Sequence, residues 1–299
     1  MKITFCNICY RWVPFNCCYF RLFISIGNIG GGKTKRSAYF KYCARFKIIY
    51  NSKNNNRKVV IYSTCFVNFN KKNTGVAALK VLKKNGVEVQ EAYPGCCGMP
   101  FLEQADLPKV VEQAKKVSKD LVEWIDKGYK VATLTASCGL MLKFEWPLLL
   151  PNDEKVKKLS TNVMDIDEYI VDIANNEGLV EGLKEIDGGV TVHHACHARA
   201  QNMGIKARDM LKLIPNVKID VVERCAGHGG TFGVMKETHD LANKVGRPTA
   251  RQIKTKNNKY MASDCPLAGK HLKQLEVDTN ISNDEALHPI ELMAKSYKL

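Results

Sequence analysis

Six cysteines in this chain each follow a short apolar run that has the composition of a buried β-strand. They form two sets of three: Cys65, Cys96 and Cys138, and then Cys196, Cys225 and Cys265. The cysteines are separated by 31 and 42 residues in the first set and by 29 and 40 residues in the second. Because corresponding separations differ by only two residues, the pattern indicates that one module is repeated in the sequence. Cysteines that strand ends deliver to a common point are typical of a metal-ligand set.

The apolar runs alternate with segments of helical periodicity. Predicted strands cover residues 58–63, 87–92, 130–135, 189–193, 217–222 and 258–262. Predicted helices lie near 73–85, 106–126, 164–174, 203–213 and 231–246, with one more from Pro266. This alternation predicts an α/β fold of two similar modules, duplicated about a pseudo-twofold axis, with parallel sheets and flanking helices. Groups beyond the carboxyl ends of such strands face one crevice, so we expect the cysteines to meet there.

Composition divides the chain into four segments. They are a basic N-terminal extension (1–57), a first module (58–151), a helical connector (152–187) and a second module (188–299). Residues 1–58 hold twelve Lys or Arg and no acidic residue, so the rest of the chain has 33 basic and 30 acidic residues. The net charge of +15 therefore belongs to the extension, and we expect no nucleic-acid partner. A P-loop-like run at 27–34 lies too close to the first strand to be followed by a nucleotide-binding sheet.

The twelve cysteines bear on the compartment and on the chemistry. No apolar run reaches the roughly 18 residues that a membrane span needs, and the start lacks a convincing signal peptide. We therefore expect a cytoplasmic protein. Reducing compartments keep thiols free, so the cysteines favour metal ligation or redox chemistry over a disulfide framework.

The run 94–98, Pro-Gly-Cys-Cys-Gly, is the strongest local signal. Two adjacent cysteines cannot readily both point into one core, but on a turn both thiolates can reach a metal cluster. Helices that begin after the cysteines would stabilise thiolate charge and raise the potential of an iron–sulfur centre. Zinc is the alternative metal, although structural zinc sites usually contain paired C-x-x-C motifs and none occurs after residue 9. Inert buried thiols are the remaining interpretation.

These motifs resemble the cysteine-rich CCG domain, which occurs in subunits of three oxidoreductases: heterodisulfide reductase, anaerobic glycerol-3-phosphate dehydrogenase and, in its iron–sulfur subunit, glycolate oxidase. The first copy of the family pattern is matched by Thr64-Cys65, by residues 94–98 and by Ser137-Cys138-Gly139. The second is matched by His194-Ala195-Cys196, Cys225-Ala226-Gly227 and Ser263-Asp264-Cys265-Pro266. The resemblance covers residues 58 to about 295.

The two copies differ in the number of cysteine ligands available to a metal. By resemblance, the first keeps four thiolate ligands, enough for one four-iron cluster: Cys65, Cys96, Cys97 and Cys138. In the second copy Ala226 replaces a cysteine, which leaves three: Cys196, Cys225 and Cys265. His197 and His228 flank the cysteines of the second copy and are candidate ligands to complete it. The resemblance therefore implies one 4Fe-4S cluster and leaves a second open.

The resemblance implies an iron–sulfur electron-transfer subunit of an oxidoreductase. It would relay electrons from a flavin-dependent dehydrogenase, of the glycerol-3-phosphate or 2-hydroxy-acid type, toward a quinone or another carrier. The ferredoxin segment of the longer family members is not found here, so the donor would be a separate flavoprotein subunit or a ferredoxin-type protein. Membrane association would be peripheral and through partners. A cluster-based thiol–disulfide reductase and a non-enzymatic metal-stabilised scaffold or sensor are the alternatives.

Overall fold

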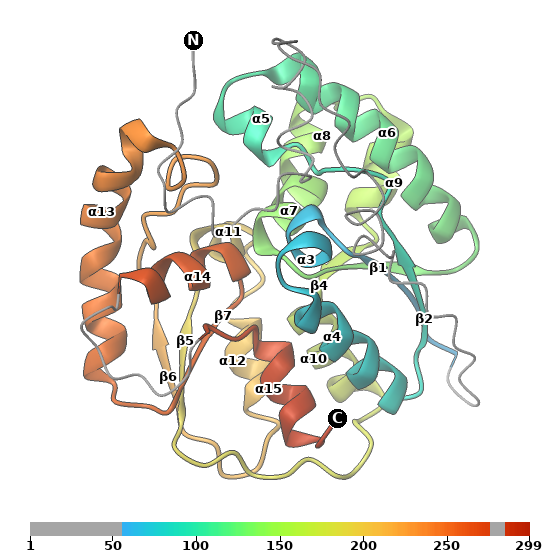
Figure 1. The fold of residues 1–299 in the computed structure, drawn as a ribbon. Coiled ribbons are helices and arrows are strands. Elements are labelled where there is room, and N and C mark those ends of the chain that lie inside the picture. The colour runs from blue at the N-terminus through green and yellow to red at the C-terminus, as the bar shows by residue number, and fades with distance from the viewer. Residues whose placement is uncertain (1–55, 276–284) are drawn as a thin grey trace, which may run out of the picture.

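The computed structural model describes residues 56–275 and 285–299 (Figure 1). Almost all of the basic extension, including the P-loop-like run, lies outside these residues. The described chain is a mixed α/β structure in which two parallel sheets are flanked by helices, as the sequence predicts. In the same residues, no helix is both long enough and apolar enough to cross a membrane.

Each sheet places the first strand of its module between the next two. The first sheet has the order β2-β1-β3-β4, with β1 (Lys58–Tyr62), β2 (Glu88–Ala92), β3 (Lys130–Thr133) and β4 (Val163–Asp165). The second has the order β6-β5-β7, with β5 (Val190–His193), β6 (Ile219–Val222) and β7 (Tyr260–Ser263). All the pairings are parallel, so within each sheet the loops that follow the strands leave from one edge.

Helices connect the strands in both halves. Those of the first half are α3 (Cys65–Phe69), α4 (Lys72–Lys84), α5 (Met99–Glu103), α6 (Leu107–Asp126), α7 (Ala136–Leu140), the π-helical turn η2 (Met141–Glu145), α8 (Trp146–Leu149), α9 (Glu154–Ser160) and α10 (Ile166–Asn176). Those of the second are α11 (Cys196–Ala200), α12 (Lys206–Leu211), α13 (Lys236–Thr255), α14 (Pro266–Gln274) and α15 (Pro289–Ser296).

Two segments differ from the sequence-based expectation. Residues 164 and 165, the start of the helix predicted at 164–174, instead belong to β4 beside β3. The helix begins at Ile166, after the capping box of Asp165 and Glu168. The helix expected at 231–246 is α13, which extends further toward the C-terminus and runs from Lys236 to Thr255. Pro248 lies inside it, and the buried residues Ala250 and Ile253 beyond it keep the helix on the core.

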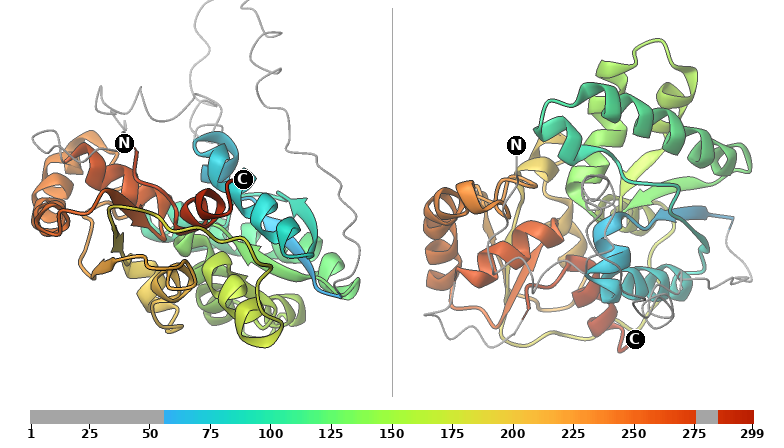
Figure 2. Two further views of the ribbon diagram at one scale, coloured as in Figure 1. Left: turned by 90° about the horizontal axis from the view of Figure 1, so that it is seen from below. Right: turned by 45° about the horizontal axis from the view of Figure 1, so that its top comes forward.

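The two halves share one apolar core. It contains buried residues from both sheets, such as Ile61 of β1 and Val192 of β5. Helix α15, from the end of the chain, packs on α4 of the first half, and α10 packs on α12 of the second (Figures 1 and 2). Figure 1 shows these four helices gathered between the two sheets. The halves are therefore built as one body.

The other faces of the sheets carry separate cores. Helices α6 to α9 cover the first sheet, over a cluster of buried residues that includes Tyr62, Trp146 and the four first-half cysteines. Helices α13 and α14 cover the second, over a smaller cluster that includes Cys265. Because side chains alternate along a strand, Val60 and Tyr62 face the cysteines while Val59 and Ile61 face the shared core.

We predict that Leu292→Ala in α15 destabilises the first half as well as the second. Leu292 is fully buried in the shared core, and emptying such a site costs about 2–5 kcal/mol. In a Trp12→Phe background, urea unfolding can be followed by the fluorescence of the two remaining tryptophans, Trp124 and Trp146, both in the first half. We expect a lower midpoint for Leu292→Ala and no shift for the control Leu148→Ala, whose side chain is 75% exposed. A first-half signal insensitive to Leu292→Ala would contradict the shared core.

Candidate metal centre

The four first-half cysteines come from the ends of three adjacent strands. Cys65 follows β1 and begins α3, Cys96 and Cys97 lie between β2 and α5, and Cys138 lies in α7 after β3. All four side chains are buried, with at most 8% exposed. The convergence predicted from the strand order is therefore present.

The four thiols form a chain of contacts. Cys96 hydrogen-bonds to Cys65 and Cys97, and Cys97 in turn hydrogen-bonds to Cys138. The bonds from the Cys65 and Cys97 thiols lower the pKa of Cys96 well below its ordinary value. Conversely, the bonds that Cys97 makes to Cys138 and Cys96, together with burial, raise the pKa of Cys97 well above it. The same contacts therefore shift the pKa values of these two adjacent thiols in opposite directions.

Backbone and aromatic donors hold the turn that carries Cys96 and Cys97. Gly98 has φ +84°, a left-handed conformation that favours glycine, and its N–H donates to Cys96 Sγ at 3.4 Å. The Tyr62 hydroxyl donates to Gly95 O at 2.7 Å, and Trp146 Nε1 donates to Cys97 O at 3.1 Å. From the sequence alone, Trp146 is expected only to fill the core, and Tyr62 is not distinguished from its strand.

The second-half cysteines follow the same topology in a more open setting. Cys196 begins α11 and Cys225 lies in the loop after β6, and both are exposed, whereas Cys265 before α14 is buried. The Gly227 N–H donates to Cys225 Sγ at 3.3 Å, the same contact that Gly98 makes with Cys96. Arg199 Nη2 lies 3.2 Å from Cys196 Sγ. Burial raises the pKa of Cys265 to about 12.

Histidines gather near the second set. His228 is buried, and its ring meets that of His271 of α14 edge to face, with centroids 5.7 Å apart. Burial lowers the pKa of His228 to about 3 and of His271 to about 4, and it also lowers the pKa of His197, which lies close enough to His228 to contribute. Burial therefore favours the neutral form of all three imidazoles, which is the form that binds metals. Sequence reasoning missed His271, whose only signal was its position six residues after Cys265.

Polar side chains next to the cysteines tie the ligand loops together. Asp264, immediately before Cys265, accepts hydrogen bonds from Ala195 N at 2.8 Å and from His194 Nδ1 at 2.6 Å. Ala195 immediately precedes Cys196, so one carboxylate sets the spacing of two cysteine loops. In the first half, Thr64 Oγ1 contacts Thr135 Oγ1 at 3.2 Å and links the loops of Cys65 and Cys138.

The two cysteine sets lie close to each other. Helix α7, which contains Cys138, packs on α11, which begins at Cys196. A negative charge on Cys138 contributes to the raised pKa of Cys265. Glu103 of α5 also accepts a hydrogen bond at 3.0 Å from Thr231 N, in the loop that follows Cys225. The second set is therefore joined to the first by direct contacts.

The kind of metal group that the first half can bind is inferred from the chemistry of its ligand side chains. No three or more His, Cys, Asp or Glu side chains among the described residues are placed to hold a single metal ion. The first-half thiols instead contact one another as a chain of four. Four converging thiols match the Cys₄ ligand set of an iron–sulfur cluster. The second half has three thiols, so it could bind such a cluster only if a histidine supplied the fourth ligand.

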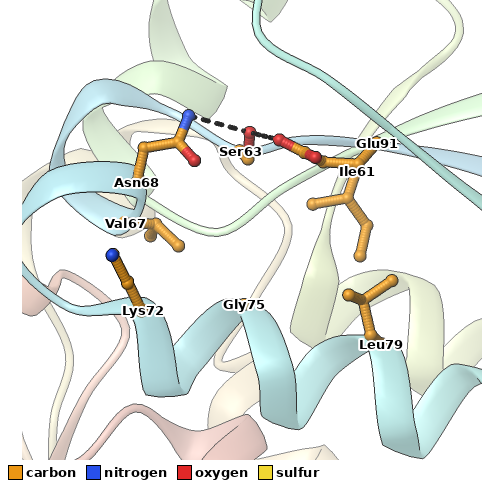
Figure 3. Close-up of a pocket in the computed structure, with 8 residues that line it drawn as sticks. All are labelled: Ile61, Ser63, Val67, Asn68, Lys72, Gly75, Leu79 and Glu91. Carbon is orange, nitrogen blue, oxygen red and sulfur yellow. Dashed lines mark hydrogen bonds between the residues drawn. The ribbon is translucent and has the colours of Figure 1, made fainter. Parts of the chain in front are cut away.

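The described surface also has a small pocket that is separate from this site (Figure 3). Ile61, Val67 and Leu79 line it, and all three belong to the shared core on the opposite face of β1 from the cysteines. On its polar rim, Asn68 Nδ2 donates a hydrogen bond to Ser63 Oγ at 3.1 Å, and the Ser63 hydroxyl donates one to Glu91 Oε1 at 2.6 Å. These side chains already bond to one another, so the pocket is not an extension of the metal centre.

The sequence profile of the CCG cysteine-rich domain matches this chain twice, at residues 59–143 and 190–273. The chain belongs to the CCG cysteine-rich domain family. The two matches together span more than half of its length and contain all seven candidate ligand cysteines. The resemblance inferred from the motifs is thereby confirmed.

The curated relatives include an iron–sulfur protein and a dehydrogenase subunit. An uncharacterized iron–sulfur protein of Methanocaldococcus jannaschii is 31% identical over 82% of this chain and 48% of its own length. A subunit of the anaerobic glycerol-3-phosphate dehydrogenase of Escherichia coli is 27% identical, over 80% of this chain and 59% of its own. Lactate utilization protein A of Bacillus cytotoxicus is 29% identical over 70% of this chain and 87% of its own length. The chain spans about half the length of the first of these relatives.

We predict that Gly227→Ala is more destabilising than Gly98→Ala. Both glycines have positive φ, which costs an alanine about 1–2 kcal/mol. A Cβ on Gly98 would meet Val110 at an ordinary 3.5 Å, whereas one on Gly227 would lie 2.2 Å from Ala242 O of α13. Gly128→Ala is the control, because φ there is +86° and nothing lies within 4 Å. Gly98→Ala and the control should have similar midpoints of urea unfolding, and Gly227→Ala should have a lower one. A Gly227→Ala midpoint equal to the other two would contradict the close packing at Gly227.

Proposed function

We propose that this protein is an iron–sulfur electron-transfer subunit of an oxidoreductase. The observation that carries the proposal is the convergence of four buried thiols from three strand ends of the first sheet: Cys65, Cys96, Cys97 and Cys138. The family membership and the iron–sulfur relatives support it independently of the geometry.

These four cysteines would hold one 4Fe-4S cluster, which when bound supplies one-electron chemistry. The chain's own contribution is to the environment of the sulfurs. Burial excludes water from them, and the Gly98 N–H directed at Cys96 Sγ stabilises negative charge, which favours the reduced state.

The second site would be a modified copy of the first. Equivalent strand orders, two family matches and the repeated Gly N–H to Cys Sγ contact support a duplication of the module. Cys196, Cys225 and Cys265 would supply three ligands there, and His228 or His197 would complete the set.

The partner would be a flavin-dependent dehydrogenase subunit, or a ferredoxin-type donor, and the acceptor a quinone or another carrier. A glycerol-3-phosphate or 2-hydroxy-acid substrate for that dehydrogenase follows the names of two relatives. We place the protein in the cytoplasm, where contact with a membrane would be made through its partners.

A cluster-based thiol–disulfide reductase is the second candidate. The observation that favours it is the exposure of Cys196 and Cys225, which leaves the second site open to a substrate sulfur. The first site, whose thiols are all buried, offers no such access.

The proposal is tested by anaerobic purification with iron, sulfide and zinc quantified and with electron paramagnetic resonance. We expect a brown protein whose cluster signal appears when a reduced flavoprotein is added. A paramagnetic signal that appears only with a thiol under oxidising conditions would favour the reductase instead. Colourless protein that contains zinc alone would overturn both and leave the metal-stabilised scaffold or sensor.

We predict that Cys97→Ser removes the first cluster, because it takes away one of four thiolate ligands. Cys225→Ser is the matched control, since it changes a ligand of the second set only. After anaerobic reconstitution, Cys97→Ser should lose the main cluster signal and Cys225→Ser should retain it. Equal iron and equal signal in Cys97→Ser and the unmodified protein would show that the ligand assignment is wrong.

A further inference from the structure

Two aromatic side chains bracket the Cys96-Cys97 pair. On one side the Tyr62 hydroxyl donates to Gly95 O at 2.7 Å, and on the other Trp146 Nε1 donates to Cys97 O at 3.1 Å. Both side chains are fully buried. The accepting carbonyls precede and follow the two cysteines, so the peptide groups at both ends of the pair are held.

The two donors come from the elements that deliver the other thiols. Tyr62 ends β1 three residues before Cys65, and Trp146 begins α8 eight residues after Cys138. The turn that carries Cys96 and Cys97 is therefore bonded to the chain segment of each remaining ligand. These two bonds join the turn to β1 and to α8, the elements beside which its side chains are buried.

The chemistry of the donors argues against simple filling of the core. A buried phenol or indole N–H without a partner is costly, so each donor favours the one turn position that satisfies it. Tyr62 and Trp146 lie in the same buried cluster as the four cysteines, so no water is available to replace either hydrogen bond.

We propose that Tyr62 and Trp146 are positioning residues for the first cluster, acting through the Gly95 and Cys97 carbonyls to hold Cys96 and Cys97 in ligating position. This inference rests on the proposed function and adds to it. Neither residue is a ligand. Loss of an outer-shell contact of this kind typically weakens metal binding about 10-fold or more.

The chain offers a matched control for Tyr62 and a second tryptophan, distant from the cysteines, for comparison with Trp146. Tyr297 is also buried and donates to a backbone carbonyl, Val180 O at 2.8 Å, but it lies in the shared core on the other side of the first sheet. Trp124, on α6, packs edge to face on Tyr129 with centroids 5.2 Å apart. Tyr62→Phe and Tyr297→Phe therefore remove the same kind of hydrogen bond from two different places.

The test is the rate at which a chelator removes iron from the anaerobically reconstituted full chain. We expect release to be about 10-fold faster in Tyr62→Phe and in Trp146→Phe than in the unmodified protein. Tyr297→Phe and Trp124→Phe should release iron at the unmodified rate. Urea unfolding of the iron-free variants checks stability, and Tyr62→Phe should lose no more of it than Tyr297→Phe. Equal iron release from these two tyrosine variants would overturn the proposal.

A second readout separates this inference from the proposed function. Maleimide labelling of the iron-free protein, read at Cys96 and Cys97 by mass spectrometry, should be faster in Tyr62→Phe and unchanged in Tyr297→Phe. If the unmodified protein takes up no iron, the proposed function fails while the labelling still decides whether Tyr62 holds the turn. If it takes up iron but Tyr62→Phe matches Tyr297→Phe in iron release, only the positioning role fails.

Discussion

The parallel pairing of β1 with both of its neighbours is the interaction on which the candidate site depends. Tyr62, the last residue of β1, lies opposite Ala92 at the end of β2 and Thr133 at the end of β3. Because the three strands end in register, the loops that follow them leave the sheet at the same height. Cysteines separated by 31 and 42 residues therefore become neighbours. A shift in register would move the loops apart and turn the strand side chains to the wrong faces.

The exchange of helices between the halves fixes the two sites relative to each other. Helix α10 follows the first sheet but packs on α12, and α15 follows the second but packs on α4. Both begin with a capping box, at Asp165 and at His288. The halves therefore cannot separate without opening their common core. This rigidity keeps the first cysteine set beside the second, as short-range electron transfer between them would require.

Much of this organisation could be predicted from sequence because it rests on local patterns. Apolar runs that end in cysteine predicted the strands and the convergence of Cys65, Cys96, Cys97 and Cys138. The remaining features depend on tertiary contacts. Pro248 suggests a helix end, yet buried residues on both sides of it keep α13 continuous. Tyr62 and His271 acquire their neighbours only through folding, so neither stands out in the sequence.

The packing of α15 on α4 also has a consequence for the order in which the protein acquires its structure. The hydrogen bond from Thr74 Oγ1 to Glu291 Oε1 joins residues 217 positions apart. During synthesis, α4 and the strands around it emerge long before α15, and until then the apolar face of α4 lacks its cover. Contacts of such high sequence separation form late and slowly. Until the last helix arrives, the nascent first half therefore exposes an apolar helix face, a feature that favours aggregation.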